Sequence, residues 1–337
     1  MKLRTYFKVL VLVLLPMSAF LILAFQDPGR LTEKAGRWVK SSLLEQVGDR
    51  ERDPTGSGGV DFAPLFSQIY EPPPCQQYQD LMVLVTSAPP NIDRRNAIRS
   101  TWARRWRRSP FSWQVVFLVG RATEQGVDAK IREEQDNFQD LLVGNYLDTY
   151  RNLTLKVMHG LKWVTSTCRP AYVLKTDDDC FVNTDRLPGF LIRDNQIRTR
   201  LYAGSLFPAE RREVIRDPGS KWYVSRQDYD KDRYPPYVSG VGYVLSLDAA
   251  RAILEAAASV RPIPVEDAYV GILAEEADIP PLGSGRFTKH NVNWRVCNYR
   301  YLMVIHHLST QEQQLAHSKM VQAWTACSES VDITKWD

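Results

Sequence analysis

The chain has 337 residues, of which 44% are hydrophobic and 24% are charged, a composition typical of a globular protein with a sizeable core. The net charge is only +4, and part of that excess lies in the N-terminal tail and in the run Arg104 to Arg108. Because the basic residues form no broad stripe, the composition excludes a basic nucleic-acid-binding domain.

An uncharged apolar segment occupies residues 9–25 and follows a short basic tail. Its length of about 17 residues is near the lower limit for a membrane span. A cleaved signal peptide is the alternative, but no small-residue cleavage site follows the segment. We therefore expect a cytosolic tail at residues 1–8, a signal anchor at 9–25 and a lumenal remainder, in a thin membrane such as that of the Golgi. The sequon at Asn152 is a predicted glycosylation site that suits a lumenal chain.

Five cysteines would lie in this oxidising compartment, and none forms a CxxC pair, so we expect disulfides and not a zinc site. Because the number of cysteines is odd, one thiol is expected to stay unpaired. Cys180 lies in an apolar, strand-like run and is predicted to be that buried free thiol. The expected bridges are Cys75 with Cys168 and Cys297 with Cys327.

Residues 26–74 show little periodicity and read as a stem, which leaves residues 75–337 as the folded lumenal domain. From residue 81 onwards, short apolar runs alternate with helical patterns, which predicts parallel strands in a three-layer α/β sheet. The predicted strands are 81–87, 113–120 and 171–176, and the predicted helices are 93–106, 152–166 and 248–259. Residues 237–246 are predicted to form a tight turn that leads into a strand.

Three consecutive aspartates, Asp177 to Asp179, follow the predicted strand 171–176. In open α/β sheets, ligands bind beyond the carboxyl ends of the strands, where these acids would lie. The sequence contains neither a GxGxxG motif after the first strand nor a GxxxxGK[ST] motif, so neither NAD nor a P-loop phosphate site is supported.

In an extended chain, Asp177 and Asp179 would share one face and Asp178 the other. Two carboxylates so close repel each other unless a cation lies between or near them. Hard oxygen ligands favour Mg²⁺ or Mn²⁺. A calcium-binding EF-hand loop is excluded because Val182 stands where that loop needs glycine. The alternative is an acidic turn that only caps the following segment.

Six segments stand out in order along the chain: RRNAIRSTW (94–102), NLTLK (152–156), YVLKTDDDCFVN (172–183), the run 216–246, VEDAYVG (265–271) and CNYRYLMVIHHLS (297–309). Together these segments resemble the β-1,3-galactosyltransferases of glycosyltransferase family 31. The resemblance implies a glycosyltransferase A-type fold, a Rossmann-like mixed sheet flanked by helices, and an inverting transfer of galactose from UDP-galactose to the 3-hydroxyl of a glycan on a glycoprotein or glycolipid.

The family's Asp-x-Asp motif falls on Asp177 to Asp179. The resemblance implies that Asp179 ligates Mn²⁺, with Mg²⁺ as an alternative, and that Asp177 and Asp178 contact ribose and nearby water or metal. The ion would stabilise the charge that grows on the UDP leaving group. The family's metal histidine aligns with His306, and His307 stands where the family has glutamine.

The family's catalytic acid falls on Glu266 and Asp267. The resemblance implies that Asp267 is the general base, with Glu266 as the alternative. Two other functions remain open: transfer of N-acetylglucosamine from its UDP-sugar, and a lectin-like binding module without turnover. The acceptor glycan cannot be read from the sequence.

Further donor contacts are expected from the same resemblance. Arg95 and Arg99, four residues apart on one helix face, are predicted to bind pyrophosphate or uridine, with a solvated basic face as the alternative. Trp222 is predicted to wall the sugar site, although core packing would suit it equally. Gly240 and Gly242 are predicted to let the backbone approach the donor closely.

Overall fold

The computed structural model describes residues 66–327 except 68, 76–78, 105–108 and 289–294, together with residue 336. The predicted cytosolic tail, membrane anchor and most of the stem lie outside these residues. Within the described part, no helix is long and apolar enough to cross a membrane.

A seven-stranded mixed sheet forms the centre of the described chain, in the order β3-β2-β1-β4-β7-β6-β8. The first four strands in sequence run parallel, β7 is antiparallel to β4 and β6, and β8 is parallel to β6. The expected mixed α/β sheet is therefore confirmed. Its strands are β1 (Leu81–Thr86), β2 (Trp113–Arg121), β3 (Leu141–Leu147), β4 (Tyr172–Asp177), β6 (Tyr202–Leu206), β7 (Val238–Ser246) and β8 (Leu282–Gly283).

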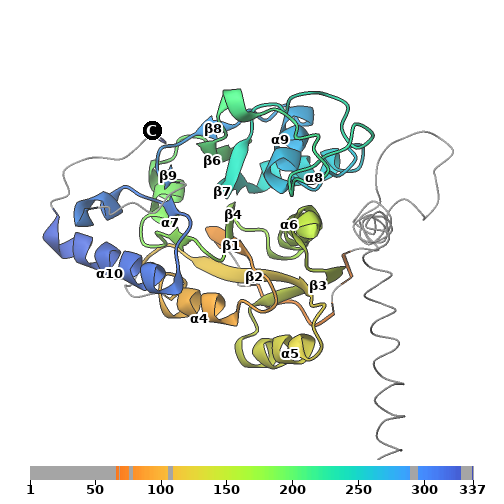
Figure 1. The fold of residues 1–337 in the computed structure, drawn as a ribbon. Helices are drawn as coiled ribbons and strands as arrows, with labels where there is room; N and C mark the ends of the chain where they lie inside the picture. Colours follow the sequence, from red (N-terminus) through yellow and green to blue (C-terminus); the bar gives the residue numbers. More distant parts are fainter. Residues whose placement is uncertain are drawn as a thin grey trace, which may run out of the picture. The chain divides into compact units, whose positions relative to one another are not determined.

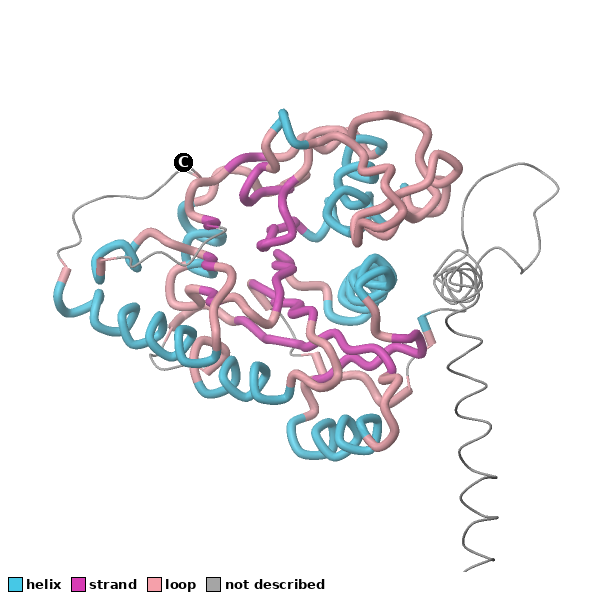
Figure 2. The backbone as a smooth tube through the Cα atoms, viewed as in Figure 1, coloured by secondary structure: helices cyan, strands magenta, loops and turns pink. Residues whose placement is uncertain are grey.

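Helices cover both faces of this sheet (Figure 1; Figure 2). One layer contains α6 (Leu153–Trp163), α8 (Leu247–Ala256) and α9 (Glu266–Glu276), and the other contains α4 (Ile92–Ser100), α5 (Val127–Phe138) and α10 (Thr310–Ala326). Every residue of β1 is buried, as is typical of a parallel strand that helices cover on both faces. A short helix, α7 (Leu187–Gly189), follows β5.

A second, three-stranded sheet lies beside the first, in the order β5-β10-β9. Its strands are β5 (Phe181–Val182), β9 (Phe287–Thr288) and β10 (Val304–Ile305). The strand β5 begins two residues after Asp179, and β10 ends just before His306. Because β5 and β10 pair antiparallel, His306 and His307 lie beside Asp179.

The predicted helix 93–106 ends earlier, at Ser100. The chain then turns inward, and Trp102 becomes fully buried and donates its indole N–H to the carbonyl of Cys180 over 3.0 Å. This long-range contact overrides the helical pattern that the sequence suggests beyond residue 100.

Several elements were not predicted, among them α5, β3, β6, α9 and α10, and one was predicted with the wrong shape. Helix α5 and strand β3 were missed because α5 buries little apolar surface besides Ile131, and β3 carries Gly144 and Asn145. The tight turn expected within 237–246 is wrong, since residues 238–246 form one continuous strand, β7.

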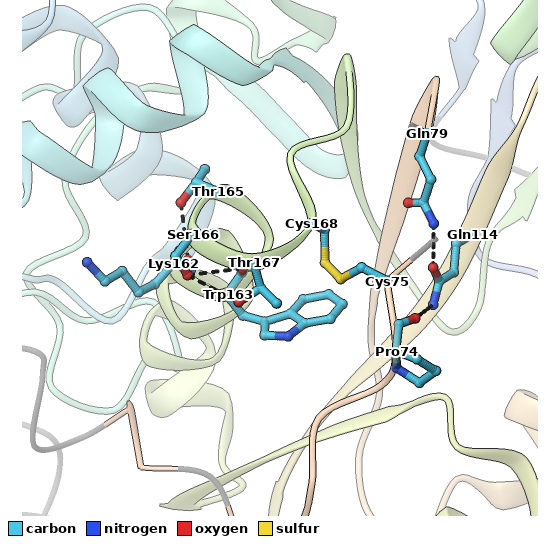
Figure 3. Close-up of a disulfide and its surroundings, with 10 residues drawn as sticks. All are labelled: Pro74, Cys75, Gln79, Gln114, Lys162, Trp163, Thr165, Ser166, Thr167 and Cys168. Atoms are coloured by element: carbon cyan, nitrogen blue, oxygen red, sulfur yellow. Dashed lines mark hydrogen bonds between the residues drawn. A yellow bond between two sulfur atoms is a disulfide. The ribbon is translucent and has the colours of Figure 1, made fainter. Parts of the chain in front are cut away.

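Both expected disulfides are present, Cys75–Cys168 and Cys297–Cys327. Figure 3 shows the first, which ties the segment before β1 to the end of the π-helical turn Val164–Cys168. Cys180 is a free, buried thiol, as predicted.

Residues 66–74, which the sequence assigned to the stem, include contacts with the folded domain. The Ile69 amide donates to the Val143 carbonyl over 3.0 Å, and Phe66 stacks on His159 with ring centroids 5.5 Å apart. The folded part of the chain therefore begins before Cys75.

Candidate active site

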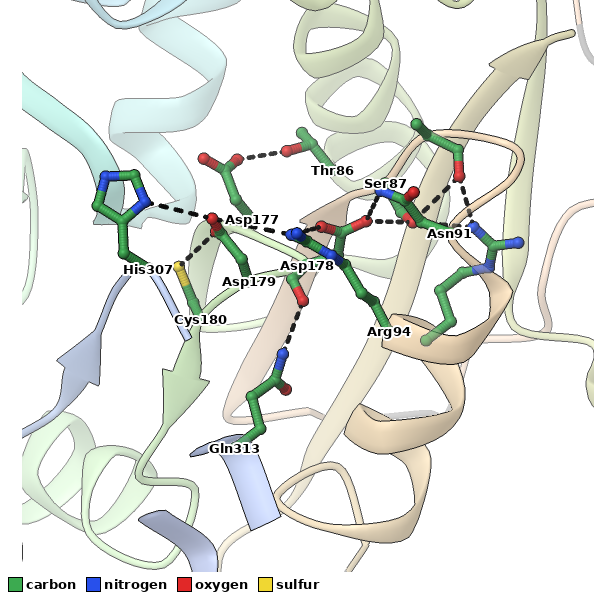
Figure 4. A network of polar contacts seen from close by, with 12 residues as sticks. Thr86, Ser87, Asn91, Arg94, Asp177, Asp178, Asp179, Cys180, His307 and Gln313 are labelled. Carbon is green, nitrogen blue, oxygen red and sulfur yellow. Dashed lines mark hydrogen bonds and ion pairs between the residues drawn. The ribbon is translucent and has the colours of Figure 1, made fainter. Parts of the chain in front are cut away.

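The carboxyl ends of β1 and β4 meet at one edge of the sheet, where Thr86 lies opposite Asp177. Asp177 ends β4, Asp178 and Asp179 follow it in a turn, and the three carboxylates have different main partners. Their carboxylates diverge toward three different groups of side chains (Figure 4). The predicted alternation of faces is therefore too simple, because the turn after Asp177 ends the extended conformation.

Asp177 is paired with a buried lysine. Its Oδ1 accepts from Lys175 Nζ over 2.8 Å and from the Thr86 hydroxyl. Burial would lower the pKa of Lys175, but the charges of Asp177 and Glu266 outweigh it and raise that pKa above its ordinary value. Lys175 thus supplies the positive charge that Asp177 needs. Asp177 lies outside the cluster of Asp179, His306 and His307, and its role as a metal ligand stays a prediction.

Asp178 fastens the loop between β1 and α4. Its carboxylate accepts from Ser87 Oγ at 2.7 Å, Asn91 Nδ2 at 2.9 Å and Arg94 Nη1 at 3.1 Å. These donors fill most of the acceptor capacity of a carboxylate. The position of Asp178 is therefore explained by its hold on the loop, and the predicted ribose contact finds no support in this geometry.

Asp179 faces two imidazoles. Its Oδ1 lies 3.3 Å from His306 Nε2, and its Oδ2 lies 3.6 Å from His307 Nδ1. Burial would raise the pKa of Asp179, but the contact with His306 and the nearby positive charges outweigh it and lower that pKa. An ionised carboxylate beside two imidazoles is a donor set that fits a divalent ion such as Mn²⁺.

Glu266 and Asp267 open helix α9, but their surroundings differ. Glu266 is buried, accepts from the Tyr243 hydroxyl over 2.6 Å and lies 3.4 Å from Lys175 Nζ. Asp267 is partly exposed and accepts from the Gly240 amide over 2.9 Å. Burial raises the pKa of both carboxyls, and this effect outweighs the attraction of Lys175. Asp267, but not Glu266, lines the aromatic pocket described below.

Two pockets open beside these carboxylates. The aspartate pocket, of about 320 Å³, includes Asn91, Arg94, Tyr150, Lys156 and Asp177 to Asp179 in its lining. The aromatic pocket, of about 270 Å³, includes Tyr150, Phe207, Trp222, Tyr234, Tyr237 and Asp267. Because Tyr150 lines both, the two pockets adjoin at its side chain.

The two predicted donor-binding arginines lie elsewhere. Arg95 is fully buried and forms a bidentate pair with Glu134, with N–O distances of 2.8 and 2.7 Å. Arg99 pairs with Asp140 and Glu134 and lies over the ring of Phe138 at 4.0 Å. Arg95 ties α4 to α5, and Arg99 ties α4 to α5 and to Asp140 just before β3. Neither arginine lines the aspartate pocket described above, so this geometry gives no support to their predicted donor contact.

Arg94, one residue earlier, is the arginine of the aspartate pocket. Its side chain is 41% exposed, and Nη1 lies 3.1 Å from Asp178 and 3.8 Å from Asp179. Neighbouring residues on a helix point about 100° apart. The sequence places arginine at both positions and does not reveal which one faces the pocket.

Replacing Arg95 with methionine should lower the free energy of unfolding by about 3–5 kcal/mol, because Glu134 would be left as a buried, partly unpaired charge. Urea unfolding of the purified full chain measures this loss. Arg94→Met is the matched control, and it should cost no more than about 1 kcal/mol, because the Arg94 side chain is 41% exposed and Asp178 keeps the hydrogen bonds from Ser87 and Asn91. Equal losses in the two variants would contradict the assignment.

Trp222 is 48% exposed and lines the aromatic pocket, so the alternative of core packing is wrong. Gly240 positions Asp267 through its amide, and Gly242 is buried within β7, where an added Cβ would lie 3.2 Å from the Lys175 carbonyl. Both glycines therefore have packing or positioning roles, and their predicted contact with the donor stays a prediction.

The predicted glycosylation at Asn152 is not supported. The side chain is buried, and its Nδ2 donates to the Leu147 carbonyl over 2.8 Å. A glycan on that nitrogen would need room that the fold does not leave.

The comparison with known proteins decides the family. Residues 93–283 match the family model described as Galactosyltransferase, and this range contains the three aspartates and both acids of α9. The chain belongs to the galactosyltransferase family. Mouse and human β-1,3-galactosyltransferase 1 are each 33% identical to it over 247 residues, which cover 72% of this chain and 75% of theirs.

A second relative of this galactosyltransferase-family chain is β-1,3-galactosyltransferase 5 of Pan troglodytes. It is 36% identical over 234 residues, which cover 67% of this chain and 76% of the relative. Among solved structures, that of the galactosyltransferase LgtC with donor and acceptor sugar analogues is 11% identical, covers 75% of this chain and 98% of its own, and has a TM-score of 0.36. A similarity this low carries no functional weight.

From the sequence of this galactosyltransferase-family chain, no role was assigned to several residues of the site, among them Lys175, Lys156 and Tyr150. Lys175 and Lys156 stand inside quoted motifs, and both are buried cations paired with Asp177 and Asp148, respectively. A lysine within an apolar strand or helix pattern was the signal that could have found them, since a buried lysine needs a partner. Tyr150 gave no comparable signal.

Proposed function

We propose that this protein is an inverting glycosyltransferase that moves galactose from UDP-galactose to the 3-hydroxyl of an acceptor glycan, forming a β-1,3 linkage. Family membership supports the transfer of galactose, and the names of its relatives support the linkage. The observation that carries the proposal is the pair of adjoining pockets. One holds the three aspartates, the other holds Asp267, and both contain Tyr150.

The aspartate pocket is the proposed donor site, in a glycosyltransferase A-type fold. Asp179 and His306 would hold Mn²⁺, with Mg²⁺ as the alternative, and the bound ion would supply charge stabilisation for the departing UDP. Arg94 reaches the same pocket with an exposed guanidinium, which suits phosphate oxygens. Ser87 and Asn91 keep this edge of the pocket in place through Asp178.

The aromatic pocket is the proposed acceptor site. Its tyrosine, tryptophan and phenylalanine side chains offer flat apolar surfaces with polar tips, which suit the mixed surface of a sugar ring. Asp267 would accept the proton of the attacking 3-hydroxyl. The Gly240 amide fixes the orientation of its carboxylate, and burial raises its pKa toward the range in which a carboxylate is an effective base.

Asp267 is a better candidate for the base than Glu266. The Glu266 carboxylate is enclosed by Tyr243 and Lys175 and does not line either pocket, whereas Asp267 lines the aromatic pocket. Glu266 therefore balances the charge of Lys175, which in turn holds Asp177 and the Gly240 carbonyl.

A donor competition assay tests which sugar the protein transfers. The purified full chain, supplied with Mn²⁺ and an array of acceptor glycans, should release UDP and incorporate galactose when UDP-galactose and UDP-N-acetylglucosamine are both present. Preferred incorporation of N-acetylglucosamine would contradict the proposal and would show that the protein transfers N-acetylglucosamine instead of galactose. Glycan binding with no UDP release from either donor would instead favour the lectin-like module.

We also propose that the chain is a single-pass type II protein of the Golgi membrane, with tail 1–8, anchor 9–25 and the catalytic domain in the lumen. The uncharged apolar segment and the basic residues before it support this orientation. Protease treatment of sealed Golgi vesicles should leave the domain intact. Digestion of the domain without detergent would contradict the orientation.

A further inference from the structure

One of the two histidines beside Asp179, His307, has an unusual backbone conformation. His307 has a φ of 64°, one of five non-glycine residues with positive φ in the described chain. Two of the others, Gln139 and Arg169, are helix C-caps, where this conformation is common. His307 ends no helix. A left-handed non-glycine residue of this kind is strained and is often found at ligand-binding sites.

This conformation turns both imidazoles toward one carboxylate. In an extended chain, two successive side chains point to opposite faces. Here the rings of His306 and His307 lie with centroids 3.9 Å apart, and each has a nitrogen near a different oxygen of Asp179. Figure 4 shows the imidazole of His307 directed at Asp179.

The backbone locks this arrangement. The Leu308 amide donates to the Asp179 carbonyl over 2.8 Å, and the His306 amide donates to the Thr288 carbonyl over 3.1 Å. The pairing of β10 with β5 fixes the residues on either side. The His307 side chain is therefore carried by a loop that is hydrogen-bonded to the aspartate itself.

The distances suit a shared ion better than direct hydrogen bonds. Charged N–H···O bonds are about 2.7–2.9 Å long, and both His–Asp separations, 3.3 and 3.6 Å, exceed this. Two ligand atoms on one ion, with bonds of about 2.0–2.2 Å and angles near 90–110°, are separated by about 2.8–3.6 Å. The candidate ligand atoms of all three residues lie within 4.8 Å of one another.

We propose that His307 is a second imidazole ligand of the divalent ion, so that this chain binds its metal through Asp179, His306 and His307. The inference rests on the proposed function in so far as that function requires a metal at Asp179. Two imidazoles and one carboxylate favour ions that accept nitrogen ligands, such as Co²⁺, Zn²⁺ and Mn²⁺, over Mg²⁺. The remaining coordination positions stay open for oxygen atoms of a diphosphate.

Metal binding can be measured without any turnover. We expect His307→Gln to weaken the binding of Co²⁺ to the purified full chain by about 100-fold and that of Mg²⁺ far less, since glutamine replaces a nitrogen ligand with an oxygen ligand. Titration in the presence of UDP gives both affinities. Pulsed electron paramagnetic resonance of bound Mn²⁺ should reveal two coupled imidazole nitrogens in the unaltered chain and one in the variant.

His317→Gln is the matched control, because His317 lies on α10 and is not part of the cluster. It should leave the Co²⁺ affinity unchanged. A Co²⁺ affinity that is unchanged in His307→Gln, or a single coupled nitrogen in the unaltered chain, would overturn the inference. Either result leaves the galactose-transfer proposal standing, since that proposal is tested separately by UDP release.

Discussion

Replacing Asp267 with asparagine should lower kcat for galactose transfer by about 100- to 10,000-fold, the usual contribution of a positioned general base. Asparagine keeps the shape of the side chain and can still accept from the Gly240 amide, so the loss would report the missing proton acceptor. The initial rate of UDP release at saturating donor and acceptor measures the effect. A variant that retains full kcat would exclude Asp267 as the base.

Glu266→Gln is the matched control for this prediction. Glu266 lies beside Asp267 but does not line either pocket, and its carboxylate is engaged by Tyr243 and Lys175. We expect a much smaller loss of kcat, together with lower stability because Lys175 loses one partner. If Glu266→Gln were the more damaging change, the two acids would have to exchange roles.

The pH profile provides an independent check on the same residue. Asp267 must be ionised to accept a proton, and burial raises its pKa above the ordinary aspartate value of 3.8. Activity should therefore fall as the pH decreases through that raised pKa, so the acidic limb of kcat/KM should lie above pH 3.8. The Asp267→Asn variant should lose this limb. An unchanged limb in the variant would assign it to another group.

Replacing Asp179 with alanine should lower kcat/KM by at least about 100-fold, because metal stabilisation of a leaving group amounts to several kcal/mol and each 1.4 kcal/mol is a factor of ten. The same change should abolish Mn²⁺ binding, since Asp179 is the carboxylate that both imidazoles approach. Steady-state kinetics and Mn²⁺ titration of the full chain measure the two losses together.

The Asp177→Asn variant tests whether Mn²⁺ binding depends on Asp179 alone or on every aspartate of the motif. Asp177 is paired with Lys175 and lies outside the metal cluster, so the Mn²⁺ affinity of this variant should stay within about threefold of the original, since most of the ligand set is intact. A loss of Mn²⁺ binding as large as that of Asp179→Ala would confirm Asp177 as a ligand.

The sequence by itself determined the framework of the site. Buried apolar runs followed by polar residues predicted β1 and β4, and with them the sheet edge at which Asp177 to Asp179 lie. The oxidising compartment and the number of cysteines led to the expectation of disulfides and of one free thiol, Cys180. These features follow from local patterns, in which a residue's neighbours along the chain largely set its environment.

Only the tertiary structure decided which polar side chains face the pockets. From the sequence, Arg95 was predicted to bind the donor, but in the fold it pairs with Glu134 of α5, which is 39 residues away in the sequence. Lys175 lies in a strand whose other residues are mostly apolar, and there it neutralises Asp177. Likewise, the backbone turn at His307 directs its imidazole to Asp179. Arg95 and His307 meet partners that are distant along the chain, and packing alone brings those partners together, whereas Lys175 is two residues from Asp177 and is buried because its strand lies inside the sheet.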